Sequence, residues 1–190
     1  AKALRGGGAV SDSTAGAAPG RQMALTLARK AGDMLAAAQG PRIAVLEMGG
    51  WDTHANQMNP NGALANNLRT LDAALSSLRD SLGAAWRRSM VLVATEFGRE
   101  VSVNGTMGSD HGTGGAAFVL GGAVAGGRVV ADWPGLSKSQ RHEGRDLRIT
   151  TDLRAAMKGV LADHLQLPSA AIESSVLPGS AALKPLSLLA

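Results

Sequence analysis

Cysteine and tyrosine are both absent from this 190-residue chain, and aromatic residues together make up only 3% of it. Without cysteine the chain can form neither a disulfide bond nor a thiolate metal site. The shortage of aromatic rings leaves Ala, Leu, Val and Met to build the core. The longest apolar run, residues 116–127, is short and interrupted by glycine, so the sequence predicts no membrane span.

The charged residues also exclude one class of function. The formal net charge is +4, but apart from Arg87 and Arg88 the basic residues are scattered. No basic tract with interleaved aromatic residues is present, so we expect no nucleic-acid partner. The first residues do not follow the pattern of a signal peptide, and they suggest a piece of a longer precursor.

The chain is long enough for one domain with a core, and 45% of its residues are apolar. Residues 1–19 are rich in Gly, Ala and Ser, which predicts a flexible N-terminal segment. We find no internal repeat and no linker after this segment. We therefore expect residues 20–190 to form a single α/β domain, the C-terminal part of a larger one.

Three segments have the apolar periodicity of helices. They are residues 20–39, 64–82 and 150–165. The second segment is the clearest, because its leucines recur at alternating spacings of four and three and form one stripe. Thr150 or Thr151 is the expected N-cap of the third helix.

Continuous apolar runs at residues 42–48 and 90–95 predict strands that are buried on both faces. They flank the leucine-striped helix, and a strand, a helix and a strand in this order form a βαβ unit. We therefore expect a mostly parallel sheet. Two shorter strands are expected at residues 116–120 and 128–130.

Polar residues follow both long strands where each strand ends. Asp52 and His54 come after the first, and because they are two residues apart in an extended segment, we expect them to point the same way. Glu96 follows the second strand, and Asp110 and His111 lie in the glycine-rich loop beyond it. Ligands of parallel sheets bind at the carboxyl ends of the strands, so we expect these residues to share one edge.

Three carboxylates and two imidazoles suit zinc, manganese or magnesium rather than soft metals. Arg99 adds a guanidinium group for a phosphate or a sulfate. The same residues also have ordinary structural interpretations. Asp52 can close an Asx turn, and His54 can pack under Trp51. Glu96 and Arg99 can form a salt bridge.

Three motifs of the chain together resemble a known family. They are GGWDTHANQ from Gly49, ATEFGRE from Ala94 and GSDHGTGGAAFVLGG from Gly108. The family is the bacterial domain-of-unknown-function family numbered 1501, and the resemblance covers residues 22–165. Through this family the chain is similar to the alkaline-phosphatase-like superfamily. That similarity implies a three-layer αβα sandwich with a mostly parallel sheet, and an exported or periplasmic protein.

The superfamily also implies a two-metal site for the hydrolysis of phosphate or sulfate esters, with a small anionic ester as substrate. Asp52 and His54 match one of its metal-binding pairs, although the usual spacing is wider. The next pair matches Asp110 and His111 by spelling. We prefer the match by topology. In that match, Glu96 takes the place of the Asp in the superfamily's second metal-binding pair, and His111 takes the place of a single metal-binding histidine that comes later in the superfamily sequence.

The topological match puts Phe97 where a histidine of the second metal is expected. The Ser or Thr nucleophile of the superfamily precedes the region that this chain covers. Ser109 is a poor substitute, because no nucleophile elbow surrounds it. Two hypotheses therefore stand. One is a metal-dependent ester hydrolase whose nucleophile lies outside this chain, and the other is a non-catalytic binding or assembly module that keeps the fold without the metals.

Overall fold

The computed structural model describes residues 17–189, with side chains from Gly20 onward, and the chain divides into two compact units. Unit 1 runs to Ala85 and also includes Thr106–Gly108. Unit 2 comprises Trp86–Gly105 and the residues from Ser109 onward. The flexible segment expected at residues 1–19 lies almost entirely outside the described residues.

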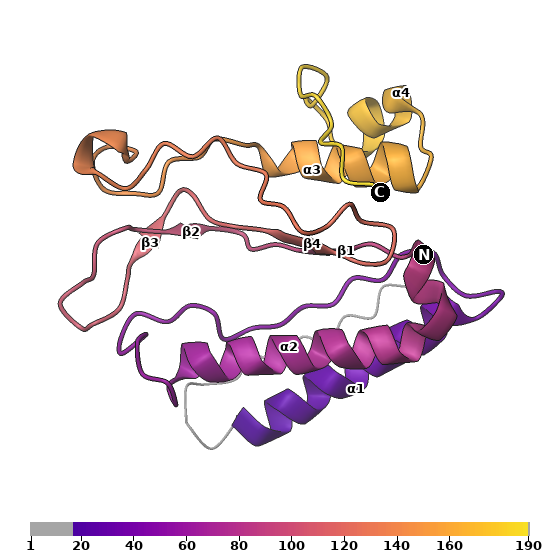
Figure 1. Ribbon diagram of the computed structural model, residues 1–190, viewed down its shortest axis with the longest axis horizontal. Helices are drawn as coiled ribbons and strands as arrows, with labels where there is room; N and C mark the ends of the chain where they lie inside the picture. The colour runs from indigo at the N-terminus through magenta and orange to yellow at the C-terminus, as the bar shows by residue number, and fades with distance from the viewer. Residues whose placement is uncertain (1–16, 190) are drawn as a thin grey trace. The chain divides into compact units, whose positions relative to one another are not determined.

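Two helices build unit 1, and they pack against each other along their length (Figure 1). They are α1 (Ala17–Ala36) and α2 (Ala63–Leu82), which confirms the first two predicted helices to within three residues. Their buried apolar side chains are Ala28, Ala31, Ala74, Leu78 and Leu82. Most of these are small, so the two backbones come close together.

Gly32 on α1 marks a close approach of the two helices. A Cβ atom at Gly32 would lie 2.6 Å from the Cβ of Ser81 and 2.9 Å from the carbonyl oxygen of Leu78. The leucine stripe predicted on α2 therefore packs against the small residues of α1 and is only partly covered. Leu78 and Leu82 are buried, whereas Leu68 is 49% exposed.

The strand predicted at residues 42–48 is wrong. The segment joins no β-ladder, and Ile43 and Val45 are 60% and 87% exposed. A continuous apolar run indicates affinity for a partner surface, but a strand forms only when that partner is hydrogen-bonded beside it. The expected βαβ unit is therefore absent from the described residues.

Four short strands in unit 2 form two antiparallel pairs. β1 (Val91–Val93) pairs with β4 (Phe118–Leu120), and β2 (Gly98–Arg99) pairs with β3 (His111–Gly112). The prediction of a three-layer αβα sandwich with a mostly parallel sheet, of the alkaline-phosphatase-like kind, is therefore wrong. An apolar run reports burial and carries no information on strand direction, and an antiparallel partner nearby in sequence needs no crossover helix.

The strand expected at residues 128–130 is also wrong. No β-ladder includes this segment, and Val129 is 91% exposed. Strands at 90–95 and 116–120 are present in shortened form as β1 and β4.

The remaining elements of the chain are short helices. They are η2 (Gly83–Arg88), η3 (Lys138–Gln140), α3 (Leu153–Gly159), η4 (Val160–His164), α4 (Ser169–Ala171) and η5 (Ile172–Val176). α3 and η4 run on from each other and cover the third predicted helix. Asp152, rather than a threonine, caps this helix, because its carboxylate accepts a hydrogen bond of 2.8 Å from the backbone nitrogen of Arg154.

Lys158 holds the C-terminal part of unit 2 onto α3. Its side chain is only 5% exposed, and its ammonium group donates to the Glu173 carboxylate at 2.8 Å and to the carbonyl oxygens of Ser180 and Leu183 at 2.9 and 2.8 Å. The three bonds use all three ammonium protons. The buried ammonium group of Lys158 is therefore fully hydrogen-bonded within the fold.

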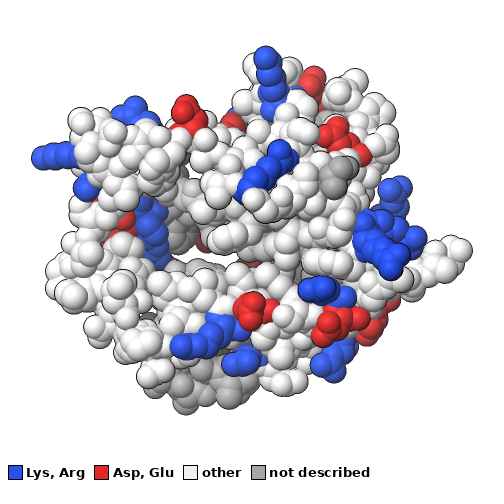
Figure 2. Space-filling model, viewed as in Figure 1, with Lys and Arg blue, Asp and Glu red and all other residues white. Residues whose placement is uncertain are grey.

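The described surface is mixed in charge. On the face drawn in Figure 2, Lys and Arg stand in small groups separated by uncharged surface and by acidic side chains. Among the helices that the structure describes, none combines the length and the hydropathy that a membrane crossing requires.

Candidate functional site

Asp52 and His54 form a close pair in the loop that precedes α2. Oδ1 of Asp52 lies 2.8 Å from Nε2 of His54, and the two side chains are 56% and 44% exposed. Thr53, between them, is engaged elsewhere, because Gln57 Nε2 donates to its carbonyl oxygen at 2.6 Å and to its hydroxyl at 2.9 Å. The loop therefore presents one carboxylate and one imidazole together, accessible to solvent.

The loop is attached to α2 just before this pair. Asn67 on α2 donates a side-chain hydrogen bond to the carbonyl oxygen of Gly50. Gly50 has a φ of 88°, a conformation that glycine adopts without the steric cost that other residues meet. The turn at Gly50 directs the chain into the Asp52–His54 segment.

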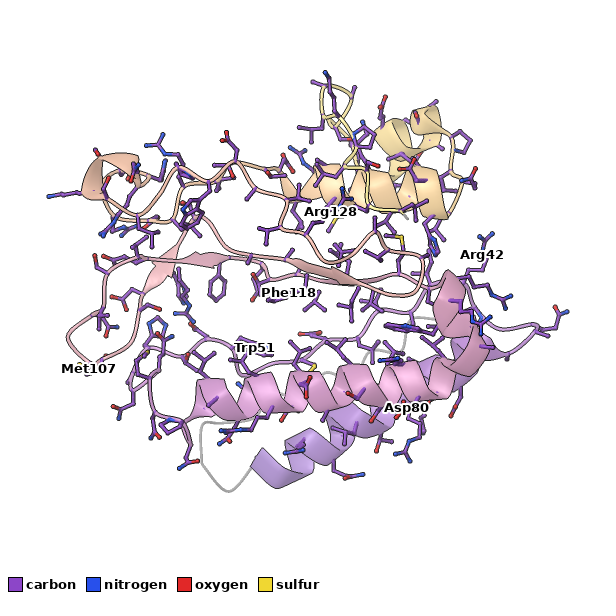
Figure 3. The ribbon with its side chains drawn as sticks, in the orientation of Figure 1. Arg42, Trp51, Asp80, Met107, Phe118 and Arg128 are labelled. Carbon is purple, nitrogen blue, oxygen red and sulfur yellow. The ribbon has the colours of Figure 1, made fainter. Side chains whose placement is uncertain are left out.

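A second attachment comes from the tip of the β2–β3 hairpin, Thr106–Gly108, which belongs to unit 1. The Thr106 hydroxyl donates to the carbonyl oxygen of His54 at 2.7 Å. The backbone nitrogens of Asn56 and Gln57 donate to the carbonyl oxygens of Thr106 and Met107 at 3.0 and 3.1 Å. Met107, labelled at this tip in Figure 3, has a φ of 61°. Three hydrogen bonds thus hold the tip against the His54 loop.

Gly108 completes this contact. The residue is buried, and a Cβ atom there would overlap the carbonyl group of His54 and lie 2.8 Å from the backbone nitrogen of Ala55. His111 follows three residues later, so the Cα atoms of Gly108 and His111 are at most about 11 Å apart, whatever the arrangement of the two units. The docked tip therefore limits how far His111 can move from the His54 loop.

His111 lies on β3 in unit 2, and its neighbours there are Phe97 and Arg99. The Phe97 and His111 rings are stacked, with centroids 4.2 Å apart and an angle of 26° between their planes. Arg99 is directly opposite His111 in the antiparallel register. Its guanidinium carbon is 5.5 Å from the centroid of the Phe97 ring. The hairpin thus gathers the Arg99 guanidinium group and the His111 imidazole around the ring of Phe97.

Arg99, the expected anion-binding residue, is engaged in the hairpin itself. Its Nη1 donates to the carbonyl oxygen of Ser109 at 3.0 Å. One N–H of the guanidinium group therefore braces the chain that leads into β3, and the group as a whole is half-buried.

Glu96 and Asp110 are placed differently from the two histidines. Asp110 Oδ1 accepts from Asn104 Nδ2 at 3.0 Å, and its backbone oxygen accepts from Glu100 N at 3.0 Å. These bonds assign Asp110 a role in closing the hairpin. Glu96 is exposed and lies three residues after the last residue of β1, Val93. Neither residue belongs to a group of three or more potential metal ligands in the described part of the chain.

Asp52 and His54 in unit 1 and His111 in unit 2 are candidate metal ligands, and each side chain offers one ligand atom. The donor set is one carboxylate oxygen and two imidazole nitrogens, which zinc accepts readily and manganese also accepts. Two of the three side chains are already paired at 2.8 Å. The chemistry of the residues therefore fits a divalent cation.

Two features of this region were not predicted from the sequence. One is the anchoring of the hairpin tip, whose only sequence signal is the glycine-rich NGTMG turn. The other is Asp146, whose carboxylate is 2% exposed and lies 2.7 Å from Nε of Arg145. The backbone of Arg145 accepts a hydrogen bond of 3.2 Å from Val101 N, beside β2. This backbone hydrogen bond links the Arg145–Asp146 segment to the hairpin that carries His111.

Comparison with known proteins assigns a family to the chain. A family model described as a protein of unknown function, DUF1501, matches residues 8–176. The chain belongs to the DUF1501 family. This confirms the resemblance that the three motifs carry. Neither the curated proteins nor the solved structures gave a significant match to this DUF1501 chain.

Proposed function

We propose that this DUF1501 protein binds a divalent metal ion through Asp52, His54 and His111. The Asp52–His54 pair carries the proposal, because its carboxylate and imidazole stand together in a loop that is fixed on both sides. An exposed pair of this kind contributes little to stability, about 0–1 kcal/mol. A fixed geometry at an exposed pair is better explained by a ligand than by folding.

The separation of the two ligand atoms is compatible with a shared metal ion. Neighbouring ligands of a tetrahedral zinc ion, bound at about 2.0–2.1 Å, are about 3.3 Å apart. The Asp52–His54 distance of 2.8 Å is close to this value, so the pair needs only a small opening. Oxygen ligands alone would favour magnesium, whereas two imidazoles shift the preference toward zinc and then manganese.

We further propose that the metal serves the hydrolysis of phosphate or sulfate esters. A bound divalent ion activates water or a hydroxyl group and stabilises developing negative charge. Asp52, His54 and His111 would hold it, and Arg99 would bind the anionic part of the ester. The support is the likeness of the three motifs to the family, together with this ligand chemistry. An exported or periplasmic location belongs to the same proposal.

Metal binding is tested by titrating the purified protein with Zn²⁺, Mn²⁺ and Mg²⁺ in a calorimeter. We expect one Zn²⁺ per chain, and a loss of affinity of about tenfold or more in each of Asp52→Asn, His54→Gln and His111→Gln, since each ligand contributes at least about 1.4 kcal/mol. His142→Gln is the matched control. His142 also lies beside a carboxylate, Glu143 at 4.0 Å, but belongs to no ligand group among the described residues. Equal affinity in all four variants would contradict the site.

A non-catalytic module is the second candidate, and one observation favours it. Arg99 and Phe97 are both occupied by hairpin contacts, so the region can serve as a rigid structural element. Because the hydrolase hypothesis places the nucleophile outside this chain, assays of the zinc-loaded full-length protein on a panel of phosphate and sulfate esters separate the two candidates. Turnover that His54→Gln abolishes and His142→Gln preserves supports the hydrolase. Zinc binding without turnover on any ester of the panel favours the module.

A further inference from the structure

Phe97 is in contact with a proposed metal ligand, His111. Its ring is stacked on the His111 imidazole, with centroids 4.2 Å apart and planes inclined by 26°. The side chain is half-buried, and His111 itself is exposed. The stack therefore gives this histidine an aromatic neighbour within unit 2.

Local structure explains why Phe97 reaches His111. Arg99 and His111 are cross-strand partners, so their side chains lie on the same face of the hairpin. Phe97 is two residues before Arg99, and alternate residues of an extended chain share a face. The Arg99 guanidinium carbon, 5.5 Å from the Phe97 centroid, flanks the same ring. Arg99 thereby helps to fix the ring that contacts His111.

A metal-binding histidine on a strand as short as β3 needs its ring to be held in place. β3 has only two residues, His111 and Gly112, and a histidine side chain has two rotatable bonds. Freezing that rotation opposes metal binding, whereas a ring already held in place binds without this loss. A stacked aromatic partner supplies the restraint without offering a competing ligand atom.

We propose that Phe97 is a positioning residue that holds the His111 imidazole ready for metal binding. This inference rests on the proposed function, since it assigns a role to Phe97 only if His111 is a ligand. Phe97 contacts no metal itself, and it acts through the ring of His111.

Phe97→Leu tests the inference, because leucine keeps an apolar side chain and removes the ring. The chain has one other phenylalanine, Phe118, which is 59% exposed on β4 in the same unit, so Phe118→Leu is the matched control (Figure 3). Phe97→Tyr restores the ring. Proton NMR of the metal-free protein reports the stack, since the Phe97 ring shifts the His111 ring protons, which are assigned by their loss in His111→Gln.

We expect Phe97→Leu to remove this ring-current shift and to weaken Zn²⁺ binding by about threefold to tenfold, the value of one aromatic stack. The visible spectrum of the Co²⁺-substituted protein should change with it, because the imidazole is no longer held in one orientation. Phe97→Tyr should restore all three properties, and Phe118→Leu should change none. Phe97→Met, which also lacks a ring, is used in the same way should the leucine variant fail to fold.

Two outcomes overturn the inference and are distinguishable. If the wild-type protein binds Zn²⁺ and the ringless variant binds it equally well with an unchanged Co²⁺ spectrum, Phe97 has no positioning role while the metal site stands. If the wild-type protein binds neither Zn²⁺ nor Co²⁺, the proposed function fails and the role of Phe97 fails with it.

Discussion

Gly108→Ala tests the link between the hairpin tip and the His54 loop. A Cβ atom at residue 108 would overlap the His54 carbonyl group, so the tip must move away. Three hydrogen bonds depend on the docked position: one from the Thr106 hydroxyl and two from the backbone nitrogens of Asn56 and Gln57. At about 0.5–1 kcal/mol for each bond, undocking the tip costs about 1.5–3 kcal/mol.

That free energy bears directly on metal binding. In the proposed metal site, His111 binds the same ion as Asp52 and His54. In Gly108→Ala, part of the free energy of metal binding must therefore be used to dock the tip again. The Zn²⁺ affinity should then fall by about tenfold to a hundredfold, since each 1.4 kcal/mol is a factor of ten. Calorimetry of Zn²⁺ binding measures this loss.

Amide hydrogen exchange gives a local measurement of the same event. The amides of Asn56 and Gln57 donate to the tip, so both should exchange faster in Gly108→Ala. Gly105→Ala is the matched control in the same turn, because a Cβ atom at Gly105 meets nothing within 4 Å. Unchanged protection of both amides together with unchanged Zn²⁺ affinity in Gly108→Ala would refute the reasoning.

Three further predictions concern the fold. Arg154 lowers the pKa of Asp152 by hydrogen bonding to its carboxylate, so the stability from this cap is complete above the unfolded pKa of about 3.9 and is lost as the pH falls through the lower folded value. Urea denaturation should show Asp152→Ala less stable by about 1 kcal/mol at pH 7, and equal to wild type at acid pH; a constant difference would contradict this. Thermal melts should show Arg145→Ala less stable than Asp146→Asn, because only the former leaves a buried carboxylate without its partner; the reverse order would count against it. Gly32→Ala should cost about 1–3 kcal/mol by forcing α1 away from the backbone of α2, and an unchanged melting temperature would rule this out.

Parts of the candidate site could be predicted from residue spacing alone. The two-residue separation of Asp52 and His54 placed both side chains on one side of an extended loop, and the structure has them 2.8 Å apart. The motif SDHG drew attention to His111. Residue spacing could not show, however, which of the adjacent residues Asp110 and His111 is the candidate ligand. Only the backbone pairing of the hairpin shows that Asp110 bonds Asn104 while His111 stacks on Phe97.

The sequence by itself determined the two long helices and the family. Apolar periodicity is a local property, so α1 and α2 could be located from it. The tertiary structure alone decided which strands form and in which direction they run, because a strand depends on a partner distant in sequence. The apolar run at residues 42–48 has no such partner in the described structure and is exposed, whereas Val91–Val93 finds Phe118–Leu120. Tertiary structure also decided that Gly108 docks on His54, since that contact joins residues 54 positions apart.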